Sequence, residues 1–235
     1  MKILAIDTSA LVASAALCED ETPIAVYSQK SGLTHSETML PIIRDLFLHT
    51  GTKLDDVDMF AVSHGPGSFT GIRIGISLIK GLAFGKHKLC IGVSTLEAMA
   101  RSLSPFCGDA LICPVMDARR GQLYTALFEV RGKALIRLSQ DAPESAQALA
   151  QRLSLYDKPV YFTGDGYEIM EGLSLSYMEE TPMHARWQNG YGVALAALEA
   201  YRRNPEPADF TDAGLRPVYL RPSQAERTLQ EPLCH

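Results

Sequence analysis

The sequence predicts an α/β protein of two lobes, each a mixed sheet flanked by helices. An apolar, strand-like segment that ends in aspartate occurs twice, at residues 3–7 and at residues 111–117. In both halves a tight turn, a strand meander and helical segments follow, so both have the order βββαβα. A polar joint with the sequence SPFCGD separates the two halves at residues 104–109. We therefore expect an N-terminal lobe at 1–105 and a C-terminal lobe at 106–235.

The first lobe begins with a strand meander, which helices and strands then follow. Residues 35–49 carry apolar side chains at helical spacing, with Pro41 in the first turns, where a helix tolerates it, and Gly51 at the end. A cap at Ser94 or Thr95 begins another helix. The remaining patterns predict strands at 3–6, 11–18, 24–28, 59–62 and 89–93, and helices at 72–84 and 94–102.

The second lobe repeats this order and ends in a proline-rich tail. Arg131, Gly132 and Lys133 form a hairpin turn between two strands. The patterns predict strands at 111–116, 122–130, 134–138 and 160–163, and helices at 145–153 and 192–202. The tail contains Pro205, Pro207, Pro217 and Pro222. We expect it to be extended and to pack back on the first lobe.

Composition and charge exclude several classes of protein. The chain of 235 residues is 46% hydrophobic and 21% charged, which is typical of a soluble globular protein. Its net charge of −5 argues against binding nucleic acid without a partner, because phosphate binding needs a concentrated basic surface. No apolar run is long enough for a membrane span, and the apolar N-terminal segment is too short for a signal peptide. We expect a cytoplasmic protein without membrane contact.

The residue types that bind metals are not arranged as a metal site. The five cysteines form no CxxC pair and are best explained as buried free thiols. His35 begins a helical segment, but position 39, where the second histidine of a helical metal pair would lie, is methionine. We therefore expect no bound metal. The GxSxG elbow of serine hydrolases is also absent.

A glycine-rich segment, HGPGSFTGIRIG, lies at residues 64–75 between a predicted strand and a predicted helix. It is neither a Walker A motif nor a GxGxxG fingerprint. Gly67, Ser68 and Gly71 supply backbone donors for a phosphate at the helix N-terminus, or they allow close packing of helix and strand. Asp7 and Ser9, at the end of the first strand, either hold Mg²⁺ or phosphate or cap a turn. These five residues are the candidates for cofactor binding.

The two helical segments at 35–49 and 72–84 carry more apolar residues than one buried face needs. Either they pack against both the sheet and each other, or they present an apolar surface to another subunit. We favour a subunit interface. The predicted interface residues are Met39, Ile42, Ile43, Leu46, Arg73, Ile76, Ile79 and Leu82.

Several short motifs follow one another in an order that is specific to one family. They include ILAIDTS at 3–9, HSE at 35–37, GPGSFTGIRIG at 65–75, MDARR at 116–120, GDG at 164–166 and PVYLR at 217–221. With these motifs the chain resembles the bacterial TsaB family, also called YeaZ, over nearly its whole length.

The resemblance implies the two-lobed fold of actin, Hsp70 and sugar kinases. It implies a role in forming N6-threonylcarbamoyladenosine (t6A) at position 37 of tRNA. In that system TsaC makes threonylcarbamoyl-AMP, TsaD transfers the threonylcarbamoyl group, and TsaE is an ATPase. A TsaB-like protein is a non-catalytic partner of TsaD and TsaE and a homodimer without TsaD. It reaches tRNA only through the complex. No catalytic residue and no cofactor are expected, and a nucleotide at a subunit junction is left open.

The residues themselves favour a degenerate cleft over an active one. The His-x-x-x-His metal motif of TsaD-type proteins is missing, and the second turn carries bulky side chains at Arg119 and Arg120. The main alternative is an ATP-dependent enzyme of sugar-kinase type, with Asp7 as its carboxylate and the glycine loop as its phosphate cradle. A glycoprotease-like peptidase is the least favoured alternative. If the cleft is degenerate, as favoured here, the glycine loop serves as the hinge that begins the helix at 72–84.

Overall fold

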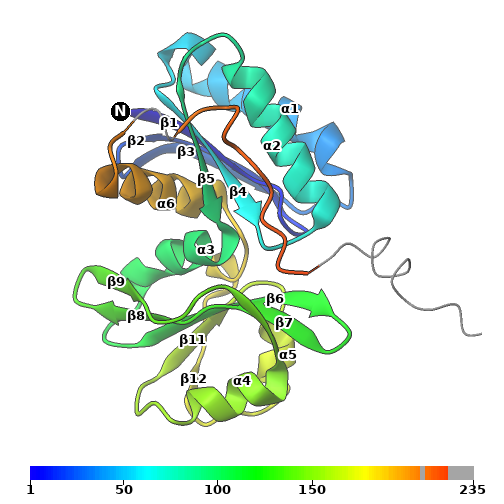
Figure 1. Cartoon of the computed structure of the whole chain (residues 1–235), viewed down its shortest axis with the longest axis vertical. Coiled ribbons are helices and arrows are strands. Elements are labelled where there is room, and N and C mark those ends of the chain that lie inside the picture. Colours follow the sequence, from blue (N-terminus) through cyan, green and yellow to red (C-terminus); the bar gives the residue numbers. More distant parts are fainter. Residues whose placement is uncertain (207–209, 222–235) are drawn as a thin grey trace, which may run out of the picture.

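The computed structural model describes residues 1–206 and 210–221. Its first sheet has five strands in the order β3-β2-β1-β4-β5 and lies in the upper half of Figure 1. β1, β2 and β3 form an antiparallel meander, and β4 and β5 continue the sheet parallel to β1. The bounds are β1 Lys2–Asp7, β2 Ala13–Glu19, β3 Thr22–Gln29, β4 Met59–Gly65 and β5 Leu89–Ser94.

Helices cover both faces of this sheet. α1 (His35–Thr50) and α2 (Phe69–Ala83) pack on one face, where the alternate strand residues Leu4, Ile6, Phe60 and Val62 are buried against them. α6 (Gly190–Arg203) packs on the other face against Ile3, Ala5 and Ala61. The last helix of the second half of the chain thus completes the core of the first lobe (Figure 1).

The second sheet has seven strands, with a central path β10-β7-β6-β11-β12, β8 paired with β6, and β9 paired with β8. α4 (Ala146–Leu153) and α5 (Tyr167–Glu171) pack on one face, and α3 (Thr95–Leu103) covers part of the other. α3 therefore lies between the two sheets (Figure 1). The strands are β6 Leu111–Arg119, β7 Gln122–Thr125, β8 Phe128–Arg131, β9 Ala134–Arg137, β10 Ala142–Ser145, β11 Val160–Thr163 and β12 Met178–Glu179; short 3-10 helices lie at Leu54–Asp56, Ser104–Phe106 and Met183–Ala185.

The structure corrects two predicted elements. Residues 122–130 are not one strand: β7 pairs with β10, whereas β8 turns away to pair with β9. The helix predicted at 72–84 begins earlier, at Phe69, because the Ser68 hydroxyl accepts a hydrogen bond from the backbone N–H of Gly71 and caps it.

Residues 210–221, which we call the strap, run from the edge of the first sheet past α2 to the second lobe (Figure 1). The N–H of Cys90 donates to the carbonyl of Phe210, and the N–H of Val218 donates to the carbonyl of His64. Arg221 then donates to the carbonyl of Ala118 in the second lobe, at 3.1 Å. The strap therefore connects the two lobes. The predicted extended positions Pro207 and Pro222 lie outside the described residues.

A cluster of charged side chains also joins the lobes. Arg137 contacts Glu97 of α3 at 3.1 Å and Asp141 at 2.5 Å, and the Ser94 hydroxyl donates to Asp141 at 2.5 Å. Burial raises the pKa of Glu97, but the hydrogen bonds and charges of Arg101 and Arg137 outweigh it and hold that pKa below its ordinary value. Across the described ranges, no helix has the length and apolar character to cross a membrane.

Candidate functional site

The glycine loop between β4 and α2 is packed against the chain's own backbone. A Cβ atom on Gly71 would lie 2.0 Å from the Thr8 carbonyl oxygen, and one on Gly67 would lie 2.4 Å from the Ser9 carbonyl oxygen. The N–H of Ser68 donates to the same Ser9 carbonyl at 2.6 Å. The glycines are thus required because the loop and the turn after β1 approach each other closely. The packing interpretation accounts for these two glycines without a ligand.

Asp7 is fully buried beneath this loop. One carboxylate oxygen accepts hydrogen bonds from the N–H and the hydroxyl of Ser9, at 2.8 and 2.6 Å, and the other accepts one from the Ser63 hydroxyl at 2.5 Å. Burial raises the pKa of Asp7, and these hydrogen bonds partly offset the rise. Both carboxylate oxygens therefore accept hydrogen bonds from the chain itself, as expected if Asp7 caps the turn.

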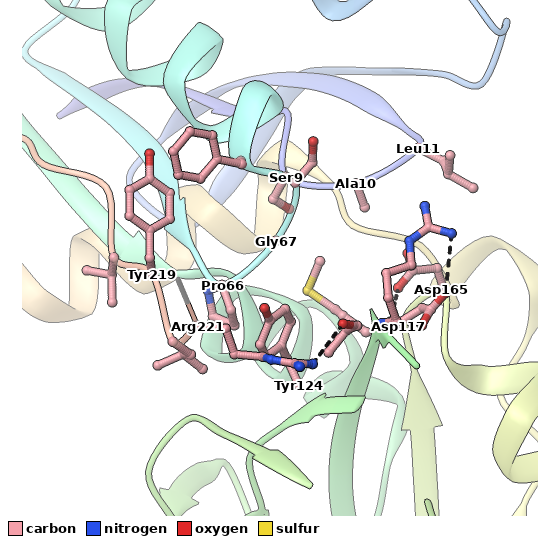
Figure 2. A pocket seen from close by; sticks show the side chains of 17 residues that line it. Ser9, Ala10, Leu11, Pro66, Gly67, Asp117, Tyr124, Asp165, Tyr219 and Arg221 are labelled. Carbon is pink, nitrogen blue, oxygen red and sulfur yellow. Dashed lines mark hydrogen bonds and ion pairs between the residues drawn. The ribbon is translucent and has the colours of Figure 1, made fainter. Parts of the chain in front are cut away.

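A cleft of about 390 Å³ lies between the lobes (Figure 2). From above, Ser9, Pro66 and Gly67 border it; the remaining wall is formed by the second lobe and the strap, with Asp117, Tyr124, Asp165, Tyr219 and Arg221. Figure 2 shows Tyr219 and Arg221 at one end and Asp117 and Asp165 at the other. The cleft therefore has Tyr219 and Arg221 at one end and two carboxylates with the cation Arg119 at the other.

The carboxylate end of the cleft rests on a strained turn. Arg119 and Arg120 both have positive φ angles, 68° and 57°, which is uncommon for residues other than glycine. Arg119 lies 3.8 Å from Asp117, and the backbone N–H of Asp117 donates to Asp165 at 3.1 Å. Burial raises the pKa of Asp165, and the negative charge of Asp117 raises it further. In the part of the chain that the structure describes, no three acidic, histidine or cysteine side chains gather as metal ligands would.

The structure corrects most of the predicted interface residues. Met39, Ile42, Ile43, Leu46, Ile76 and Ile79 are between 0 and 7% exposed and form the core between α1, α2 and the first sheet. Leu82 is half-buried against the same core. The apolar excess of the two helices thus reflects packing on the sheet. Helical spacing alone does not show which apolar side chains are turned outward. The idea that the two helices bind another subunit stays a prediction; of the predicted residues, Met39 and the exposed Arg73 line the groove between the helices.

Exposed and half-buried side chains of α1 and α2 line a shallow groove between the two helices. Leu40 is 56% exposed there, and Ile74, Ser77 and Leu78 form the facing wall. We call this the α1/α2 groove. His35 closes one end, where its ring lies 2.6 Å from the carbonyl of Ala10. An apolar groove between two helices can accept apolar side chains of another protein.

Arg73, the one charged residue predicted at the interface, is exposed and bound to the strap. Its guanidinium lies 3.8 Å from the centre of the Phe69 ring and donates to the Tyr219 hydroxyl at 2.8 Å. Phe69 and Tyr219 are stacked with ring centres 4.4 Å apart. Tyr219 and Asp165 were not among the predicted site residues. The PVYLR and GDG motifs mark their positions, but a motif does not show which distant residues it contacts.

Comparison with known proteins identifies the family. A family model described as "TsaD: tRNA N6-adenosine threonylcarbamoyltransferase" matches residues 25–201. The tRNA threonylcarbamoyladenosine biosynthesis protein TsaB of Bacillus subtilis is 32% identical over 237 aligned residues, which cover 96% of each chain. The chain belongs to the TsaB family.

Solved structures agree with this membership. YeaZ from Pseudomonas aeruginosa has a TM-score of 0.76 at 25% identity, and the match covers 93% of this chain and 99% of that one. Component A of the (R)-2-hydroxyglutaryl-CoA dehydratase of Acidaminococcus fermentans has a TM-score of 0.52 at 12% identity, covering 88% of this TsaB-family chain and all of the other. The expected two-lobed, actin-like α/β fold is confirmed.

Proposed function

We propose that this TsaB-family protein is a non-catalytic subunit required for t6A formation at position 37 of tRNA. In this proposal it binds a TsaD-type transferase and acts together with a TsaE-type ATPase in the cytoplasm. The name of its Bacillus subtilis relative, a tRNA threonylcarbamoyladenosine biosynthesis protein, supports the pathway. Without the transferase, two copies of the chain associate through the same surface. tRNA is bound only in the complex.

The observation that carries the non-catalytic assignment is the occupancy of the first-lobe site by the chain itself. Asp7 is fully buried, and both its oxygens accept hydrogen bonds from Ser9 and Ser63. Gly67 and Gly71 face carbonyl oxygens of the turn after β1 at distances that exclude even a methyl group. A carboxylate and a loop in this state are not free to hold Mg²⁺ and a triphosphate.

The α1/α2 groove supports the interface half of the proposal. Leu40 is 56% exposed in a groove that Ile74 and Leu78 also line. Burying such a side chain contributes about 1.5–3 kcal/mol to association when it is fully desolvated. We therefore assign the transferase contact to the exposed side chains of α1 and α2, in place of the core side chains that the sequence predicted.

The test is reconstitution with purified TsaC-, TsaD- and TsaE-type proteins, threonine, bicarbonate, ATP and unmodified tRNA. Mass spectrometry of the digested tRNA measures t6A. We expect t6A only when the present chain is added. Equal t6A without the chain would contradict its role as a required subunit.

One observation favours a second candidate, an ATP-dependent enzyme. Asp117 and Asp165 face the cleft between the lobes and could hold a magnesium nucleotide there. Isothermal titration of the purified chain with ATP and Mg²⁺ separates the candidates. Tight binding with turnover would support the enzyme, and its absence is expected from the non-catalytic proposal.

A further inference from the structure

A second groove, lined by positive charges, lies on the other side of α2. Its walls are α2 and the strap. Arg73 and Lys80 extend from the helix, with Ser77 between them, and Arg216 faces them from the strap. Leu215 and Pro217 complete the strap wall. We call this the α2/strap groove. It is a concave surface that carries three cations.

The cations of this groove have no acidic partner among the described residues. No carboxylate lines the groove, and none forms an ion pair with Arg73, Lys80 or Arg216 in those ranges. Arg73 uses its Nε–H for the Tyr219 hydroxyl, which fixes the guanidinium and leaves its terminal nitrogens available. Two arginines of the Glu97 cluster behave differently: Arg101 and Arg137 are both paired with Glu97. Unpaired cations gathered on a chain of net charge −5 indicate a surface that binds an anion.

The spacing of these charges suits a repeating anion. Arg73 and Lys80 are seven residues apart on one helix, which separates them by about 10 Å along its axis. That length corresponds to the rise of about three nucleotides along the axis of a nucleic-acid duplex. Ser77 lies between them, and hydroxyl groups are common donors to phosphate oxygens.

We propose that the α2/strap groove binds the phosphodiester backbone of tRNA in the assembled complex. This proposal rests on the proposed function, which brings a tRNA to the complex. It favours RNA over an acidic protein segment, because the groove presents charges in a row and the proposed substrate carries a charge on every nucleotide. The groove shares Arg73 and Ser77 with the α1/α2 groove on the opposite side of the helix. A transferase in the α1/α2 groove would cover Arg73 and Ser77 in part and would leave Lys80 and Arg216, which line only the α2/strap groove, for RNA that lies beside it.

The test measures tRNA binding by the complex of this chain with a TsaD-type transferase. Lys80→Glu and Arg216→Glu are combined, because both side chains lie in the groove and neither has an ion pair among the described residues. Lys133→Glu is the control for each single substitution, since it reverses one charge on the exposed β8–β9 turn of the second lobe, so Lys80→Glu alone is measured beside it. Filter binding at several salt concentrations gives both the affinity and its salt slope.

We expect the double variant to bind tRNA roughly 10- to 100-fold more weakly, with a salt slope lower by about 2, and the control to match the wild type. Lys80→Arg should retain the wild-type affinity. Unchanged affinity and slope in the double variant would overturn the proposal. So would loss of the complex itself on gel filtration, because the groove would then contact a protein. If the wild-type complex binds tRNA no better than the transferase alone, the proposed function fails together with the groove.

Discussion

Gly71 lies where the first turn of α2 passes over the turn after β1, and a Cβ atom at this position would meet the Thr8 carbonyl oxygen at 2.0 Å. We predict that Gly71→Ala destabilises the chain by about 1–3 kcal/mol, because backbone atoms cannot give way to the new methyl group. Urea unfolding followed by circular dichroism measures the change.

Gly81→Ala is the matched control, because Gly81 lies in the same helix and, beyond the helix's own adjacent backbone, no atom of the described residues lies within 4 Å of the place that an alanine methyl group would occupy. Alanine there should be neutral or stabilise by about 0.5–1 kcal/mol. If the two variants had equal stability, close packing would not explain the glycine at position 71.

Asp165 gives a residue-level prediction about pH. Its pKa is raised by burial and by Asp117, so the folded chain holds this proton more tightly than the unfolded chain does. Stability is therefore lost as pH rises from the ordinary value of 3.8 through the raised pKa. Asp165→Asn removes this loss and keeps an oxygen to accept the N–H of Asp117. We expect a Tm a few degrees above wild type at pH 7.

Thermal melts between pH 3 and 8 test this, with the exposed Asp157→Asn as the control. The Tm difference between Asp165→Asn and wild type should shrink as the pH falls through the raised pKa and should be smallest below 3.8. A variant that melts at or below the wild-type temperature at pH 7 would show that the Asp165 carboxylate stabilises the fold.

Helices α1 and α2 illustrate what can be learned from sequence at the level of the element. Their existence follows from apolar spacing, and His35–Thr50 agrees with the expected 35–49. Apolar spacing does not show what packs on each face of a helix, because a sheet and a partner subunit both pack against the same types of apolar residue. Ile79 is fully buried, whereas Leu40 on α1 is 56% exposed. Short elements such as β10 (Ala142–Ser145) carry no periodic pattern, since pairing with β7 alone makes them strands.

The same limit applied to the candidate site. The sequence identified Asp7 and the glycine loop as candidates and favoured turn capping and a hinge over phosphate binding, but it did not show which groups they contact. The burial of Asp7 depends on Ser63, 56 residues away, and the contact of Arg73 depends on Tyr219, 146 residues away. Local patterns do not contain such distances.

The interface assignment gives a prediction for α1. Leu40→Glu should abolish self-association and transferase binding while leaving the Tm within a few degrees of wild type, because the side chain is exposed. Ile79→Glu should instead unfold the chain, since it would bury a charge in the core. Analytical ultracentrifugation and melting curves measure the two effects.

Leu155→Glu serves as the control for a lost exposed leucine, because Leu155 is 84% exposed in the second lobe. It should associate as the wild type does. Normal association of Leu40→Glu would show that the α1/α2 groove is not the interface.

At the scale of the whole molecule, the two lobes are joined by the strap, by α3 and by the Arg137 cluster. Arg137 contacts Glu97 at 3.1 Å and Asp141 at 2.5 Å. Arg137→Ala should lower the free energy of unfolding by about 1–3 kcal/mol at pH 7, because two half-buried carboxylates lose a partner. The pKa of Glu97 is held below its ordinary value of 4.5, so the part of this stability that comes from Glu97 is present above pH 4.5 and is lost as pH falls through the lowered pKa.

Urea unfolding of this variant at pH 7 provides the measurement. Arg44→Ala is the control, because Arg44 pairs with Asp45 while 75% exposed, and it should change stability by less than about 0.5 kcal/mol. Equal effects of the two variants would mean that the Arg137 cluster does not hold the lobes together.

The central claim is that this chain supports t6A formation through its helical surface and not through chemistry in its cleft. The most direct measurement compares the t6A yield of two variants in the reconstituted system. One is the double variant Asp117→Asn/Asp165→Asn, which changes the cleft, and the other is Leu40→Glu, which changes the α1/α2 groove. We predict wild-type yield for the cleft variant and at least a tenfold loss for Leu40→Glu. Loss of t6A in the folded cleft variant, with full yield from Leu40→Glu, would contradict the account.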